Sequence, residues 1–131
     1  MLVDANVLMY AAGGAHPHKA PSVVLVRRIA TGDVDAAVDA EVLQEILHRY
    51  RALRRWAAGR EVYDHARIIF SVVLPVTIAE LDRARRLLDQ HKAIMARDAL
   101  HAAVVLEHRL EGIWSYDMDF DRIAGIRRRE P

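Results

Sequence analysis

Short apolar segments alternate with longer amphipathic segments along this chain, and this alternation limits the fold more than any other feature of the sequence. The short segments have the length and β-branched composition of strands, and they occur at residues 2–3, 35–38, 71–76, 113–115 and 126–128. The longer segments space their apolar residues as helices do, at residues 6–12, 17–32, 39–53, 56–70, 77–90 and 96–111. Strands separated by helices form parallel sheets covered on both faces, so we expect an α/β fold.

Several of these segments allow more detailed expectations. The helix at residues 17–32 should bury Val23, Val24, Val26 and Ile29, and the run 71–76 should be a buried strand. Asp39 should cap the helix that runs to residue 53. The sequence from Thr77 to Glu80 is typical of a capping box, which opens a later helix. The helix at 96–111 is apolar nearly all round and ends before a glycine, so we expect it to be buried.

The composition limits the class of protein. A length of 131 residues with 53% hydrophobic residues suits one domain, residues 1–131, with one good core. The absence of cysteine excludes disulfides, thiolate zinc sites and thiol nucleophiles. The start of the chain does not resemble a signal peptide, and no apolar run approaches the ~20 residues that cross a bilayer. We therefore expect a soluble, cytoplasmic protein that does not bind membranes.

Four acidic residues fall where an α/β sheet places its ligand site. Asp4 follows the first predicted strand, and Asp117 comes two residues after the strand at 113–115. Ligands of such sheets bind beyond the carboxyl ends of the strands. Asp98 lies in the first turn of the helix that precedes that strand, and Glu45 borders the apolar stripe of helix 39–53. These four carboxylates can therefore converge on one cleft.

Each of these acids also has a purely structural explanation. Asp4 could cap the helix after it, and Glu45 could pair with Arg49 one turn further on. Asp98 could simply be a favourable charge at a helix N-terminus. The same kind of explanation, as turn and cap residues, applies to Asp117, Asp119 and Asp121. None of these explanations accounts for two acids at strand ends and two more that can reach the same edge.

A shared cation does account for this arrangement. Four carboxylates a few ångströms apart repel one another strongly unless a positive ion lies between them. Mg²⁺ prefers oxygen ligands, and Mn²⁺ accepts the same set. A bound metal can acidify a water molecule, orient a phosphodiester and neutralise charge on its leaving oxygen. The acids therefore favour metal-dependent hydrolysis of a phosphodiester bond.

Four short motifs follow one another along nearly the whole chain. They are Asp4-Ala-Asn6, Val-Leu-Gln-Glu-Ile-Leu at 42–47, Arg-Asp-Ala-Leu-His-Ala-Ala at 97–103 and Ser-Tyr-Asp-Met-Asp-Phe-Asp at 115–121. In this order and spacing the sequence resembles the PIN-domain family, most closely its VapC-type toxin branch. Each motif alone is weak, but the four together are specific. Arg97 departs from the family pattern, in which a small or polar residue is more usual beside the third acid.

The resemblance implies a three-layer α/β/α sandwich with a short, mainly parallel central sheet. It implies a metal site built from Asp4, Glu45, Asp98 and Asp117. Asp119 would be an auxiliary ligand or an outer group of that site, and Asn6 would stabilise the site by hydrogen bonding around Asp4. The implied protein is an endoribonuclease toxin that cuts RNA with Mg²⁺ or Mn²⁺, often as a homodimer, and that a cognate antitoxin protein occludes.

Other functions remain possible at this stage. A housekeeping RNA-processing nuclease would use the same residues, and a PIN-like RNA- or protein-binding module would keep the fold without catalysis. A phosphotransferase of the haloacid-dehalogenase kind also begins with an acid after its first strand. That chemistry normally needs a second aspartate two residues later, where this chain has Asn6. The RNA target and the number of metal ions stay open.

The basic residues are almost all arginine, since only two of the 19 cationic residues are lysines. Arginine clusters at residues 49–55, 83–86 and 127–129 are candidate contacts for an RNA backbone, although a solvated helix face would look the same. The seven histidines form no H-E-x-x-H zinc motif. His48 either contacts RNA or is simply exposed. His101 either packs within its helix or supports the site from outside.

Overall fold

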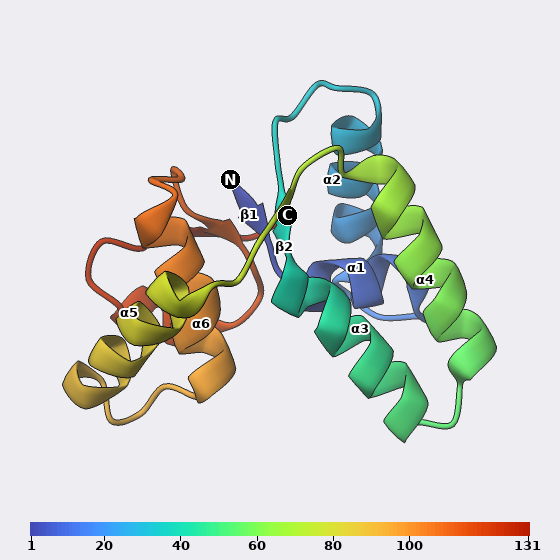
Figure 1. The fold of residues 1–131 in the computed structure, drawn as a ribbon. Coiled ribbons are helices and arrows are strands. Elements are labelled where there is room, and N and C mark those ends of the chain that lie inside the picture. The colour runs from blue at the N-terminus through green and yellow to red at the C-terminus, as the bar shows by residue number, and fades with distance from the viewer.

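The computed structural model describes residues 1–131 and places five very short strands among six α-helices (Figure 1). The strands are β1 (Leu2–Val3), β2 (Val38–Asp39), β3 (Val73–Leu74), β4 (Ile113–Trp114) and β5 (Arg128–Arg129). The helices are α1 (Ala5–Ala12), α2 (Lys19–Ala30), α3 (Ala40–Ala52), α4 (Trp56–Ile69), α5 (Ile78–Gln90) and α6 (Ala96–Glu107), with a 3₁₀ turn η1 (Met118–Arg122). None of the helices combines the length and the apolar character needed to span a lipid bilayer.

All strand pairs are parallel, as the sequence predicts. β1 pairs with β4 and β4 with β5, while β2 pairs with β3. A parallel bridge between Leu2 and Ala37 joins these two sheets, so the order across them is β3-β2-β1-β4-β5. Because the strands run in one direction, their carboxyl ends lie along one edge, where the polar residues that follow them gather.

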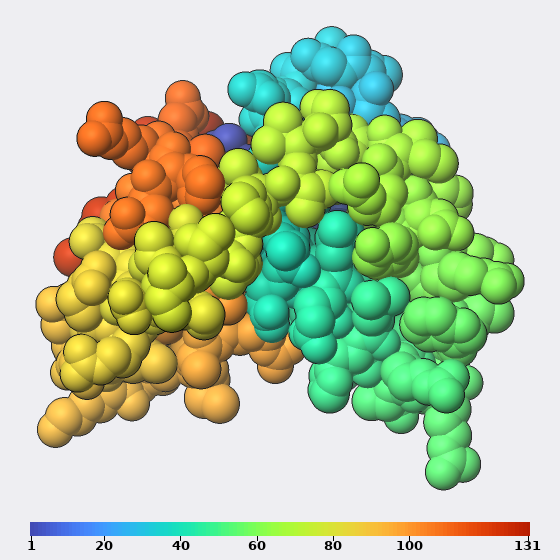
Figure 2. Space-filling model, viewed as in Figure 1, coloured from blue at the N-terminus to red at the C-terminus, as the bar shows by residue number.

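Helices cover both faces of the sheet and produce two apolar cores. On one face, α1 to α4 pack with Val3 and Val38, and on the other face α5 and α6 pack with Leu2 and Ile113 (Figure 1). The neighbouring residues Leu2 and Val3 lie in different cores, because successive side chains of a strand point to opposite faces of the sheet. The segment from α4 through β3 to α5, yellow-green in Figure 2, crosses the front of the molecule. This is the expected three-layer α/β/α sandwich.

Two strands and one helix face differ from the expectation. β3 is restricted to Val73–Leu74 and is only half-buried, because it pairs with β2 alone and lies at the edge of the sheet. β2 and β5 lie one to three residues later than the apolar pattern indicates. The prediction that Val24 faces inward is wrong: it is 55% exposed, because α2 turns Ser22, Leu25 and Ile29 toward the core.

Helix α6 ends at Glu107, four residues before the predicted end. Arg109 adopts a left-handed backbone conformation with φ of 52°, and the amide of Leu110 donates to the carbonyl of Val105 at 2.9 Å. This hydrogen bond closes the helix in the manner that usually uses glycine. The closure lets the chain turn back early enough to enter β4.

The predicted capping box at the start of α5 is confirmed. The Ala79 amide donates to the Thr77 hydroxyl at 3.3 Å, and the Thr77 amide donates to the Glu80 carboxylate at 2.7 Å. We expect Thr77→Ala to lower the free energy of unfolding by about 1 kcal/mol, measured by chemical denaturation. Thr77→Ser keeps the hydroxyl and should stay close to the parent. Equal losses in both variants would show that packing of the Thr77 methyl group matters instead.

Candidate metal centre

The carboxyl edge of the sheet collects the polar residues of the site. Asp4 follows β1, Asp39 ends β2, and Ser115 and Asp117 follow β4. Asp4 also caps α1, since its carboxylate accepts from the Asn6 amide at 3.3 Å. The capping explanation of Asp4 is therefore confirmed, and it is compatible with a role in a metal site.

A hydrogen-bonded network fixes the Asp4 carboxylate. The Asn6 side-chain amide donates to Asp4 Oδ2 at 2.7 Å and to Ser115 Oγ at 3.0 Å. The Ser115 hydroxyl donates to Asp4 Oδ2 at 2.5 Å, and it accepts from the Asp117 amide at 2.9 Å. These bonds join the ends of β1 and β4, and the predicted hydrogen bond from Asn6 to Asp4 is present.

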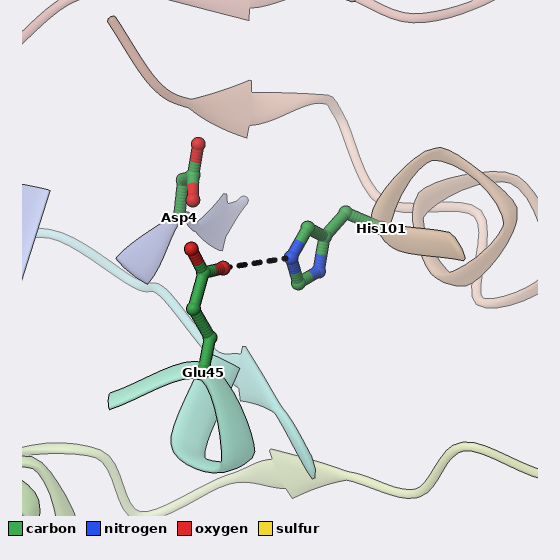
Figure 3. Close-up of side chains that lie close together, drawn as sticks. All are labelled: Asp4, Glu45 and His101. Carbon is green, nitrogen blue, oxygen red and sulfur yellow. Dashed lines mark ion pairs between the residues drawn. The ribbon is translucent and has the colours of Figure 1, made fainter. Parts of the chain in front are cut away.

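Glu45 enters the site from α3 and meets two residues of α6. Arg97 Nη1 lies 2.5 Å from Glu45 Oε1. His101 Nε2 lies 4.0 Å from Glu45 Oε2, the ion pair drawn in Figure 3. One ligand atom each from Asp4, Glu45 and His101 lie within 4.8 Å of one another. Glu45 thus forms its ion pair with the neighbouring helix and not with Arg49, the partner that its spacing along α3 suggests.

His101 is buried next to two carboxylates, which favour its protonated form. Its Nδ1 lies 2.7 Å from Asp39 Oδ2, and both residues are excluded from solvent. Burial alone would lower the pKa of His101, but the hydrogen bond with Asp39 and the nearby carboxylate of Glu45 outweigh it and raise the pKa to about 10. A doubly protonated imidazole offers no lone pair, so His101 in this state supports the carboxylates instead of binding a cation. Its place beside the site agrees with the supporting role considered from the sequence.

Three further acids form a second group at the same edge. Asp98, Asp117 and Asp119 offer ligand atoms within 4.8 Å of one another. The Met95 amide donates to Asp98 at 3.3 Å and the Asp119 amide donates to Asp117 at 2.9 Å, which fixes both carboxylates. Burial raises the pKa of Asp98 most, followed by the charge of Asp117 and then that of Asp4, and together they bring it to about 6. The two acidic groups therefore lie close enough for their charges to interact.

The charges in the two groups are balanced unequally. Burial raises the pKa of Asp4. Burial acts in the same direction on Glu45, but His101 and Arg97 outweigh it and lower the pKa of this carboxyl. Asp98 has no such ion pair, and Asp119 has only Arg122, at 3.1 Å. The negative charge that remains around Asp98 and Asp117, together with the set of carboxylate oxygens, fits a divalent cation such as Mg²⁺.

All the predicted site residues lie at this edge, namely Asp4, Asn6, Glu45, Asp98, Asp117 and Asp119. Asp121 does not join them, because it pairs with Arg128 at 2.9 Å. Sequence reasoning missed Ser115 as a partner of Asp4 and treated Asp39 only as a helix cap. Both follow or end a strand, as Asp4 does, and this shared position was a signal that could have identified them.

Comparison with known proteins identifies relatives across almost the whole chain. The family model described as PIN domain matches residues 1–126. Ribonuclease VapC13 of Mycobacterium tuberculosis is 39% identical over 128 residues, which cover 98% of each chain. The crystal structure of Mycobacterium tuberculosis VapC20, described as a Sarcin-Ricin loop cleaving toxin, matches 99% of this chain and 98% of its own with a TM-score of 0.78 at 18% identity. A toxin-antitoxin complex from Klebsiella pneumoniae matches 99% of this chain and 98% of its own, with a TM-score of 0.65 at 18% identity.

Proposed function

The chain belongs to the PIN-domain family, and from this premise we propose that it is a metal-dependent endoribonuclease, the toxin of a toxin–antitoxin pair. The observation that carries the proposal is the pair of neighbouring acidic groups at the carboxyl edge of the sheet. The relatives named as VapC ribonucleases support an action on RNA. The proposal treats residues 1–131 as one PIN domain.

In this proposal Asp4, Glu45, Asp98 and Asp117 hold Mg²⁺ or Mn²⁺, and Asp119 is an auxiliary ligand. The bound ion would acidify a water molecule and neutralise charge on the phosphodiester. The carboxylates need a cation at neutral pH, because Asp98 keeps its charge next to Asp117 at an energetic cost. This chemistry requires no nucleophile from the protein.

The surrounding residues orient these carboxylates. Asn6 and Ser115 hold Asp4 by hydrogen bonds, so one of its oxygens keeps a fixed direction. Arg97 and His101 hold Glu45 from α6. Residues that hold metal ligands in this way typically contribute roughly 10- to 100-fold to metal affinity or activity, because they fix the geometry of the ligands.

We also propose that a cognate antitoxin protein binds this chain and that the toxin forms a homodimer. The antitoxin part is supported by the similarity to the Klebsiella pneumoniae chain, which was solved in a toxin-antitoxin complex. An antitoxin that occludes the acidic edge would block access of RNA to all the proposed ligands at once.

The function is tested by incubating the purified protein, freed of any bound partner, with a mixed RNA pool. We expect cleavage with Mg²⁺ or Mn²⁺ and none with chelator, because the carboxylates alone supply no nucleophile. Asp4→Asn should be inactive while remaining folded by circular dichroism.

If the folded parent binds Mg²⁺ but leaves every RNA intact, the nuclease proposal is wrong. Cleavage that persists in chelator would contradict the role of the metal. A housekeeping nuclease is distinguished by its effect in cells, since its expression without an antitoxin would not arrest growth.

A further inference from the structure

A groove of about 480 Å³ leads away from the acidic site between α1 and α3, which lie side by side (Figure 1). Asn6 and Glu45 line its inner end. Tyr10, Arg49 and Arg55 line the rest. The groove is therefore continuous with the place where a phosphodiester would be cut.

The charge of the groove is positive. Glu45 is the only acidic residue that lines it, and Arg97 already neutralises this carboxylate at 2.5 Å. Arg49 and Arg55 line the groove without any ion-pair partner, in contrast to Arg85 or Arg122, which pair within their own elements. Two unpaired guanidinium groups in one groove suit the phosphates of a nucleic acid.

The backbone fixes the start of the Arg55 side chain. Arg54 has φ of 56°, a left-handed conformation that costs a residue other than glycine about 1 kcal/mol or more. The Arg55 amide donates to the carbonyl of Tyr50 at 2.9 Å and so closes the end of α3. The backbone of Arg55 is therefore held between the end of α3 and the start of α4, so this groove-lining residue does not lie on a free loop.

Tyr10 gives the groove an aromatic wall that is held in place by other rings. His16 stacks on it with centroids 4.4 Å apart, and Tyr116 meets it edge to face at 5.3 Å. Tyr116 directly precedes Asp117, so this ring cluster also borders the proposed metal ligands. Unpaired nucleobases stack on such pre-arranged aromatic rings, whereas paired bases do not offer their faces.

We propose that this groove binds the single-stranded RNA segment next to the scissile phosphodiester, with Arg49 and Arg55 on its phosphates and Tyr10 against a base. This inference rests on the proposed function, because it takes RNA as the substrate. It adds the path of the strand and the side chains that hold it.

The test measures binding of a fluorescein-labelled, mixed-sequence single-stranded RNA to the full chain in chelator, where no cleavage occurs. The variant is Arg49→Gln/Arg55→Gln, and the matched control is Arg86→Gln, an exposed arginine without an ion pair on α5, across the sheet. Loss of two phosphate contacts should weaken binding about 10- to 30-fold near 0.1 M salt and reduce the salt slope by about 1.4. Tyr10→Ala should weaken binding at least about fivefold without changing that slope, and Tyr10→Phe should keep the affinity.

Several results would overturn the proposal. One is equal binding by the double variant and the Arg86 control. Another is a parent that does not bind single-stranded RNA without metal, because the arginine contacts need none. Preserved RNA binding combined with lost antitoxin binding would assign the groove to the protein partner. Each of these can occur in a protein that cuts RNA with metal, so failure of the groove is separate from failure of the nuclease.

Discussion

Replacing Asp98 with asparagine is expected to reduce RNA cleavage by at least about a hundredfold and, at the same time, to raise the melting temperature of the metal-free protein. The loss of activity follows from the proposed ligand role, since even partners outside the ligand shell contribute about 10- to 100-fold. The gain in stability follows from the cost of placing this carboxylate beside Asp117, which together with burial raises its pKa to about 6. A dead variant that is more stable than the parent cannot owe its inactivity to misfolding.

The sign of the stability change depends on pH. The pKa of Asp98 rises from 3.8, the ordinary value, to about 6 in the folded protein. Between these two pH values the folded state keeps a proton that the unfolded state has lost, so the stability of the metal-free parent falls as pH rises. Asp98→Asn removes this dependence. Its advantage in melting temperature should therefore be small near pH 4 and largest above about pH 6.

A thermal-shift series with and without Mg²⁺ measures both effects. Mg²⁺ should raise the melting temperature of the parent at neutral pH, because it binds only the folded state, and should do little for Asp98→Asn. Asp82→Asn, which removes an exposed acid without an ion pair on α5, is the control and should behave as the parent. Cleavage by Asp98→Asn at the parent rate would exclude Asp98 as a ligand, and a lower melting temperature above pH 6 would show that its charge is not costly.

The positions of the acids could be predicted because they follow from local rules. Asp4 comes directly after one parallel strand and Asp117 comes shortly after another, and the carboxyl ends of these strands must share an edge. Asp98 sits in the first turn of a helix and Glu45 borders an apolar stripe, and both placements need only helical periodicity. The fold class followed from the same alternation of strands and helices.

The partners of these acids could not be predicted, because they come from packing between distant elements. Spacing along α3 favours Arg49 as the partner of Glu45, yet the side chains of Arg97 and His101 reach Glu45 from α6 instead. Asp39 caps α3 through the Val42 amide, as predicted, but its second oxygen meets His101 across the sheet edge. No local pattern contains this second contact.

The end of α6 was misplaced for a related reason. Gly112 is the first glycine after the helix, so the sequence pattern assigns the helix end to it. The helix instead ends with a left-handed arginine, Arg109, and Gly112 enters β4 with φ of 154°. Gly112 is therefore required for the close approach of β4 to β5 and not for ending α6.

Gly112→Ala is accordingly expected to cost about 3–5 kcal/mol of stability, a large share of the ~5–15 kcal/mol typical of a native protein. An added Cβ would lie 2.0 Å from the Arg127 carbonyl oxygen, which accepts the Ile113 amide at 2.9 Å where β4 meets β5. The added Cβ would collide with backbone atoms of Arg127, so a side-chain rotation cannot relieve the clash. Backbone strain of about 1–3 kcal/mol and overpacking of a similar size add to one another.

Substitutions at two other glycines distinguish the cost of backbone strain from the cost of a steric clash. Gly14 has an ordinary φ and would meet no atom within 4 Å of an added Cβ, so Gly14→Ala should be nearly neutral. Gly32 has φ of 81° and equally open surroundings, so Gly32→Ala should cost only the strain, about 1 kcal/mol. Chemical denaturation of all three should rank the losses as Gly14→Ala, then Gly32→Ala, then Gly112→Ala.

If Gly112→Ala costs no more than Gly32→Ala, β4 and β5 can separate without loss, and their register does not determine the site. If the cost is large, the register matters for function too, because β4 leads directly to Ser115 and Asp117. Gly112→Ala should then lose Mg²⁺-induced stabilisation even at a temperature where it remains folded. The position of the proposed metal ligands would thus depend on a residue that contacts none of them.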